Sequence, residues 1–118
     1  MAVAQSAWSD ASLPGAAACH AGQGLGRIVA INSDAARTAT GMGLCAYGAA
    51  KAAAIGFILN LSGEVSLHGV TANALSLGTM NNWEGPEKIA KKGTSIGRAG
   101  SPQDVGAAVT YLASTEAE

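Results

Sequence analysis

Residues 26–51 read GRIVAINSDAARTATGMGLCAYGAAK, and this stretch decides the fold. The apolar run 28–31 is typical of a strand buried on both faces of a parallel sheet. It leads to Ser33 and then, through a loop of small residues, to a helix predicted to begin at Leu44. Because ligands of open α/β sheets bind beyond the carboxyl ends of the strands, we expect a site at Ser33.

The predicted helix carries Tyr47 and Lys51, which are four residues apart and therefore share one face. The phenol of a free tyrosine has a pKa of about 10, which is high for proton transfer near neutrality, and a lysine one turn on can favour the phenolate. Reduction of a carbonyl leaves an oxygen that needs a proton and a hydrogen-bond donor. Tyr47 is the candidate acid, and the hydroxyl of Ser33 is the candidate donor.

Downstream, the helix is predicted to run to about residue 68, where Gly69 is a natural left-handed stop. Residues 70–75 form the second predicted strand, so that strand, helix and strand make one right-handed unit. The loop 77–82 is then expected at the same sheet edge as Ser33. Three glycines, at 48, 56 and 63, weaken the helix by about 1 kcal/mol each, and we expect close packing to compensate them.

Three further segments complete the secondary-structure prediction. Residues 1–12 are rich in Ala and are predicted to be helical. Residues 83–92 read as a short charged helix, either a lid over the strand-end site or a plain surface linker. Ser101, Pro102 and Asp104 match the start of a last helix: an N-cap, a first-turn proline and an acid three residues after the cap.

Four segments, in this order, resemble the short-chain dehydrogenase/reductase family: GRIV, AYGAAKAA, GVTANAL and IGRAGSPQDV. The resemblance begins near residue 13 and runs to the end of the chain. It implies an α/β fold, a partial Rossmann-like doubly wound parallel sheet in a three-layer α/β/α arrangement, with residues 1–118 as one partial domain and no second domain. It also implies Ser33, Tyr47 and Lys51 as the catalytic residues.

The same resemblance implies NAD or NADP as the cofactor. Tyr47, Lys51, Gly78 and Asn82 would bind it, with Lys51 at the nicotinamide ribose and the other two in a loop over the nicotinamide end. The sequence departs from the family at several points. Ser33 lies fourteen residues before Tyr47, one more than usual, so Asp34 holds the strict position. We interpret this as a one-residue insertion, with Asp34 facing the site as the alternative.

The glycine-rich first half of the family is missing. The glycines of residues 22–26 precede the predicted strand, whereas a phosphate-binding loop follows a strand and opens a helix. With two predicted strands, we expect poor independent stability and a truncated or incompletely predicted gene product.

Composition narrows the function classes. The chain of 118 residues is 48% hydrophobic and 13% charged, with a net charge of −1, which gives no electrostatic footprint for nucleic acid or an anionic membrane. An uninterrupted apolar run of about twenty residues is missing, so no membrane span is predicted. Cys19 and Cys45 lack metal-type spacing and are predicted to be reduced thiols in a cytoplasmic protein.

Two functions of different classes compete. The first is an NAD(P)-dependent oxidoreductase that transfers hydride between nicotinamide and a small-molecule carbonyl or secondary alcohol, with Tyr47 as general acid/base. The second is a truncated, non-catalytic remnant that at most self-associates through the helix 44–68, the helix through which a full-length protein would form a homo-oligomer. A serine hydrolase is a distant third, because the sequence has neither G-x-S-x-G nor a histidine placed as base.

Overall fold

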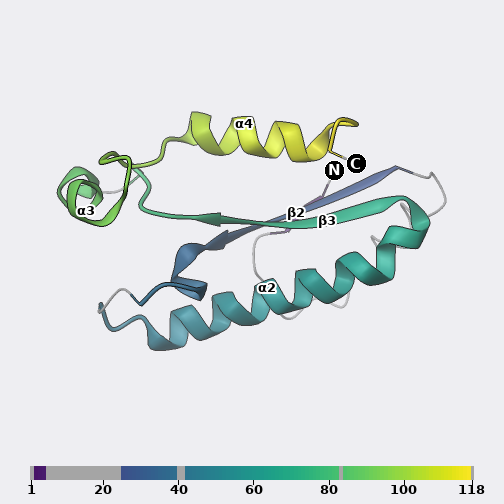
Figure 1. The fold of residues 1–118 in the computed structure, drawn as a ribbon, viewed down its shortest axis with the longest axis horizontal. Coiled ribbons are helices and arrows are strands. Elements are labelled where there is room, and N and C mark those ends of the chain that lie inside the picture. Colours follow the sequence, from purple (N-terminus) through teal and green to yellow (C-terminus); the bar gives the residue numbers. More distant parts are fainter. Residues whose placement is uncertain (1, 5–24, 40–41, 83, 118) are drawn as a thin grey trace.

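The computed structural model of the chain describes residues 2–4, 25–39, 42–82 and 84–117. Three parallel strands form one sheet in the order β1-β2-β3. The strands are β1 (Ala2–Ala4), β2 (Gly26–Ser33) and β3 (Val70–Leu77), and the helices are η1 (Asp34–Ala36), α2 (Cys45–Val65), η2 (Ser66–His68), α3 (Pro86–Gly93) and α4 (Pro102–Ala113). Helix α2 covers one face of the sheet and α4 the other (Figure 1). The predicted three-layer α/β/α arrangement is therefore confirmed.

The N-terminal prediction was wrong where the structure describes it. Residues 2–4 form a strand rather than a helix, and they pair in parallel with β2 from Ala2 opposite Ile28 to Ala4 opposite Ala30. Backbone hydrogen bonding to the edge of β2 outweighs the helical preference of alanine in this short segment. The sheet consequently has three strands where two were expected, whereas residues 5–12 lie outside the described part of the chain.

Successive side chains of β2 and β3 point to opposite faces of the sheet, so each strand contributes residues to the packing on both faces. One face, with Ile28 and Ala72, joins the α2 residues Ile58, Leu61 and Val65 in a single apolar core. On the other face Arg27 donates a hydrogen bond from Nε to the carbonyl of Ser114, 3.2 Å away, just after α4. Ile28 and Val29 are buried as predicted, whereas Ala30 and Ile31 are half-buried, and in β3 only Val70 and Ala72 are buried, so the burial expected for strands covered on both faces is confirmed only in part.

The long helix ends as predicted. After α2, the 3-10 turn η2 stops at Gly69, whose φ of 70° is left-handed. Of the three helical glycines, only Gly48 packs closely: a Cβ there would lie 2.8 Å from the carbonyl oxygen of Ala35. At Gly56 and Gly63 a Cβ would meet no atom within 4 Å among the described residues, so the expected compensation is found at one position in three.

By length and composition alone, α2 with η2 (Cys45–His68) is apolar enough to cross a membrane, with a mean hydropathy of 1.2 over an 18-residue window. The sequence predicts no membrane span. The average hydropathy is nevertheless high, because many small apolar residues outweigh the charged residues Lys51 and Glu64. Only 11% of that window is buried within the chain. The core helices of soluble proteins pass the same test, so the finding is weak evidence for a membrane.

The last helix begins with the predicted cap. The Ser101 Oγ accepts from the Asp104 backbone N–H at 3.3 Å, and the Asp104 carboxylate accepts from the Ser101 backbone N–H at 2.8 Å. Arg98 adds two hydrogen bonds to the same carboxylate, at 2.7 and 3.0 Å. These bonds, with Arg98 first, hold the pKa of the Asp104 carboxyl well below its usual range. The start of α4 is therefore fixed by a reciprocal polar network.

Candidate functional site

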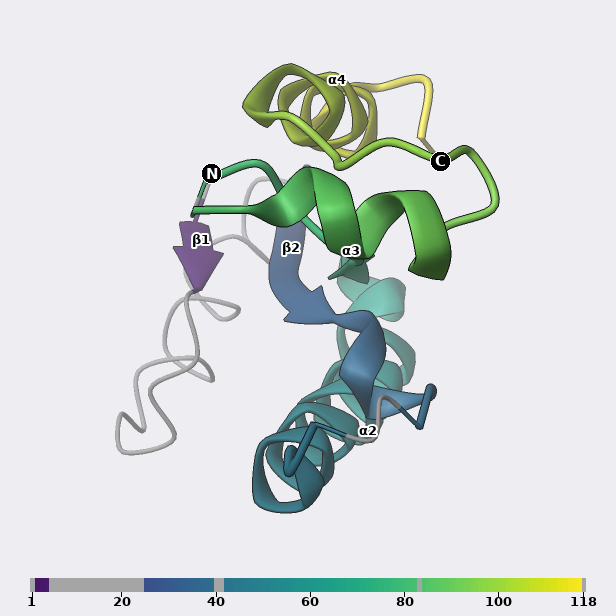
Figure 2. The same cartoon turned by 90° about the vertical axis from the view of Figure 1, so that its left-hand side faces the viewer.

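The carboxyl ends of β2 and β3 lie at one edge of the sheet, together with η1, the start of α2 and the helix α3 (Figure 1). Ser33 is the last residue of β2 and is paired in register with Leu77, the last residue of β3. Figure 2 looks onto this end, where α3 lies in front, with α4 and α2 on either side of the strand ends. The structure therefore brings the polar loops of both strands to the edge at which the sequence placed a site.

Tyr47 and Lys51 lie together on α2. The Lys51 Nζ is 5.5 Å from the centroid of the Tyr47 ring, which is within the range of a cation–π contact. The tyrosine is 46% exposed, so a ligand can reach its phenol. This pair supplies an ammonium beside an accessible hydroxyl in the first two turns of the helix.

Ser33 is held by the turn that follows it. Its backbone is extended, and its Oγ accepts a hydrogen bond from the Ala35 N–H at 3.3 Å as the N-cap of η1. The carbonyl of Ala35 in turn lies against Gly48, next to Tyr47 in the chain. The absence of a side chain at Gly48 therefore lets the loop of Ser33 and the helix of Tyr47 approach each other.

Asp34 also lies at this edge. Its Oδ2 is 3.5 Å from the position that a Cβ of Gly78 would take, so the carboxylate lies beside the loop after β3. Ser33 bonds to the backbone of η1, while Asp34 reaches across to the neighbouring strand end. Asp34 therefore lies at the edge of the candidate site. Ser33, rather than Asp34, caps η1.

Asn32 is a buried polar residue of this region, with 5% exposure. Its Nδ2 donates to the carbonyl of Lys51 at 2.9 Å, and its Oδ1 accepts from the N–H of Ser33, also at 2.9 Å. Sequence reasoning missed this residue. The two partners that it joins are eighteen positions apart, and no local pattern signals such a contact.

Gly78 and Asn82, the other two residues predicted to bind the cofactor, lie in the loop after β3. Gly78 directly follows β3 and is next to the Asp34 carboxylate. Asn82 is exposed in the loop before α3, and within the described part of the chain its side chain makes no hydrogen bond. The structure therefore brings Gly78 to the strand-end edge, whereas the described residues give the Asn82 side chain no hydrogen bond that would place it in the site.

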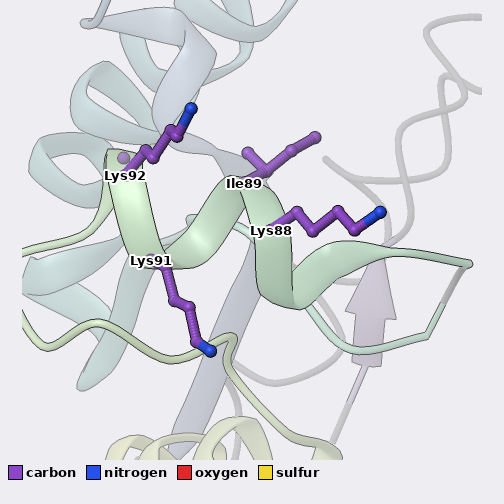
Figure 3. A pocket seen from close by; sticks show the side chains of 5 residues that line it. Lys88, Ile89, Lys91 and Lys92 are labelled. Atoms are coloured by element: carbon purple, nitrogen blue, oxygen red, sulfur yellow. The ribbon is translucent and has the colours of Figure 1, made fainter.

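Helix α3 carries a shallow hollow lined by Lys88, Ile89, Lys91, Lys92 and Gly93. Figure 3 shows the three lysine side chains pointing in different directions from the helix. Because their ammonium groups diverge, they do not enclose a common ligand. The candidate catalytic and binding groups at the carboxyl ends of the strands therefore belong to η1, α2 and the strands themselves, and not to α3.

Comparison with known proteins agrees with this architecture. The sequence profile described as enoyl-(acyl carrier protein) reductase matches residues 1–118. The short-chain reductase protein NovJ of Streptomyces niveus is 36% identical over 107 residues, which cover 80% of this chain and 40% of that protein. The 3-oxoacyl-[acyl-carrier-protein] reductase FabG of Vibrio cholerae is 34% identical over 100 residues, covering 78% of this chain and 40% of that enzyme.

The solved structures lead to the same class. A 3-oxoacyl-[acyl-carrier protein] reductase from Brucella melitensis with bound NAD superimposes with a TM-score of 0.76 at 29% identity, covering 84% of this chain and 38% of that one. The Rossmann-like α/β sheet of this chain is therefore shared with that solved structure. The chain belongs to the short-chain dehydrogenase/reductase family. It spans about two fifths of the length of the relatives it matches.

The described residues fit one end of a nicotinamide dinucleotide, the cofactor that family membership supports. The Lys51 ammonium is a donor for ribose hydroxyls, and the Tyr47 phenol beside it is accessible. The glycine run 22–26 ends at the first residue of β2, so it precedes a strand. In the described ranges no glycine-rich loop follows a strand and opens a helix, as pyrophosphate binding requires.

Proposed function

We propose that this chain carries the catalytic half of an NAD(P)-dependent oxidoreductase that reduces a small-molecule carbonyl or oxidises the corresponding secondary alcohol. The observation that carries the proposal is the Lys51 ammonium over the ring of Tyr47, at the sheet edge where β2 ends in Ser33. The relatives named above are reductases, two of them of 3-oxoacyl groups. Because the chain covers only part of each relative, the activity remains a proposal.

In this proposal, the nicotinamide group supplies or accepts the hydride. The Tyr47 phenol donates a proton to the carbonyl oxygen in reduction and takes it back in oxidation. The Ser33 hydroxyl donates a hydrogen bond to that oxygen, which stabilises its developing negative charge. The Lys51 ammonium, which lies beside the phenol, binds ribose hydroxyls.

Four further parts of the proposal concern the cofactor contacts, the domain, the location and the oligomer. Gly78 and Asn82 contact the cofactor from the loop after β3, and residues 1–118 belong to a single domain. The protein is cytoplasmic.

The protein forms a homo-oligomer through α2, whose outer face exposes Phe57 by 40% and Leu59 by 70%. Apolar side chains of this size on a helix that is mostly unburied in the chain favour a protein partner.

A non-catalytic remnant is the second candidate. It is favoured by one observation: within the described residues, no glycine-rich loop follows a strand and opens a helix, as pyrophosphate binding requires. In that case the chain keeps the arrangement of Ser33, Tyr47 and Lys51 but binds no dinucleotide. Its only property in solution would be self-association through α2.

The substitution Tyr47→Phe separates these candidates. It removes the proton donor and keeps the ring that lies under Lys51, so reduction of carbonyl substrates should fall by about 10²- to 10⁴-fold while nucleotide binding is retained. Activity is measured with NADH and NADPH, and nucleotide binding by calorimetry. Tyr111→Phe is the matched control, because Tyr111 is 58% exposed on α4.

Equal loss of nucleotide binding and activity in Tyr47→Phe would contradict the role given to the phenol. Failure of the unsubstituted chain to bind either nucleotide would favour the remnant.

A further inference from the structure

The buried side chain of Asn32 lies between the strand that ends in Ser33 and the helix that carries Tyr47 and Lys51. This side chain projects from the carboxyl end of β2 toward α2 and uses both of its polar atoms. One bond reaches the carbonyl of Lys51 on the helix, and the other holds the N–H of Ser33 on the strand. At 5% exposure, the amide exchanges little with water, so both bonds are shielded.

The bond to the Lys51 carbonyl connects the two elements that bear the proposed catalytic groups, and the bond from the Ser33 N–H, within β2, fixes the orientation of the amide. Ser33 moves with the end of β2, whereas Tyr47 and Lys51 move with the first turns of α2. The apolar core holds α2 farther along, at Ile58, Leu61 and Val65. Near Lys51, the described contacts across to β2 and η1 include the Asn32 amide and the close approach of Gly48 to Ala35.

We propose that Asn32 is a positioning residue, which sets the distance between the Ser33 hydroxyl and the Tyr47–Lys51 pair by binding both elements through one side chain. The inference rests on the proposed function for its catalytic consequence. Its geometric part does not, because the amide bonds exist whether or not the chain turns over a substrate. Asn32 itself touches no substrate and transfers no proton.

The test uses Asn32→Asp, which keeps an acceptor for the Ser33 N–H and removes the donor to the Lys51 carbonyl. Asn60→Asp is the matched control, because Asn60 also donates through Nδ2 to a helix carbonyl, that of Gly56, at 2.8 Å but in an exposed position. A third variant combines Asn32→Asp with Gly56→Ala. The alanine meets no atom within 4 Å and strengthens the helix, so it offsets a general loss of stability.

We expect kcat of Asn32→Asp to fall on the order of 10- to 100-fold with KM unchanged, since small misplacements of reacting groups have effects of this size. The double variant should recover its unfolding temperature and keep the low kcat, and Asn60→Asp should match the unsubstituted chain. Recovery of kcat together with the unfolding temperature would reduce Asn32 to a structural role and overturn the proposal.

A second measurement does not depend on activity. Nuclear Overhauser contacts between Gly48 and Ala35 report the approach of α2 to η1, and they should weaken in Asn32→Asp and persist in Asn60→Asp. Unchanged contacts in Asn32→Asp would overturn the positioning role. If the unsubstituted chain proves inactive, the proposed function fails, while these contacts still decide whether Asn32 positions the two elements.

Discussion

The two halves of α2 are held in different ways. The C-terminal half packs Ile58, Leu61 and Val65 into the apolar core against the sheet. The N-terminal half has no buried apolar residue; it is held by the approach of Gly48 to a carbonyl and by one amide from Asn32. One helix therefore combines a half stabilised by buried area with a half stabilised by a few specific contacts.

The difference separates stability from function along a single element. Apolar contacts are numerous and tolerant of small shifts, whereas a hydrogen bond or a backbone contact defines a distance. The groups proposed for chemistry, Tyr47 and Lys51, lie in the half that depends on such distances. Substitutions in the C-terminal half should therefore mainly lower stability, whereas substitutions in the N-terminal half should mainly lower activity.

The largest effect on stability is expected for Leu61→Ala. Leu61 is 8% exposed in the core, and its truncation should lower the free energy of unfolding by about 3 kcal/mol through lost burial and a cavity. Chemical denaturation monitored by circular dichroism measures the change. Activity per folded molecule should remain, and its selective loss would mean that the two halves are not separable.

Gly48→Ala should act on the other half with a smaller cost. The new Cβ would lie 2.8 Å from the Ala35 carbonyl oxygen, so the start of α2 must shift. We expect a loss of about 1 kcal/mol after the gain in helix propensity is counted, with a larger loss of activity than of stability.

Gly56→Ala is the matched control for this substitution. It lies on the same helix and meets no atom within 4 Å, so it should raise the free energy of unfolding by about 1 kcal/mol. Denaturation curves of the two variants, recorded side by side, give the comparison. Equal changes at both glycines would contradict the distinction drawn between the halves.

The smallest effect on stability is expected for Leu59→Lys on the outer face of α2. Leu59 is 70% exposed, so the free energy of unfolding should change by less than about 0.5 kcal/mol. If α2 associates with a second copy, the charge should shift the chain toward a monomer in sedimentation experiments. Leu67→Lys, at a position 90% exposed in η2, is the control. An oligomer that survives Leu59→Lys unchanged would place its interface elsewhere.

Much of the architecture could be predicted because its signals are local. The strand ending at Ser33, the left-handed stop at Gly69 and the cap at Ser101 each follow from a few adjacent residues, and the structure confirms them. Tyr47 and Lys51 share a face because helical spacing requires it, and they lie in contact. Their catalytic roles remain predictions.

The features that the sequence did not predict share one cause: each depends on a contact with a residue in another element. Alanines 2 and 4 favour a helix in isolation, and only the neighbouring strand makes them extended. Likewise, nothing in the sequence distinguishes Gly48 from Gly56, because the carbonyl that Gly48 approaches belongs to another element. The role of Asn32 is hidden for the same reason.

A last consequence concerns the loop after β3. Met80 and Gly100 form an isolated parallel bridge, with Asn81 N–H bonded to the Gly100 carbonyl and Gly100 N–H to that of Thr79, both at 2.8 Å. The two ends of the segment that contains α3 are therefore joined before α4 begins. Insertions, deletions or whole replacements between these ends can be accommodated without moving the sheet or α4. This segment is thus the natural position at which evolution, or a designer grafting loops, can exchange sequence while the rest of the fold stays fixed.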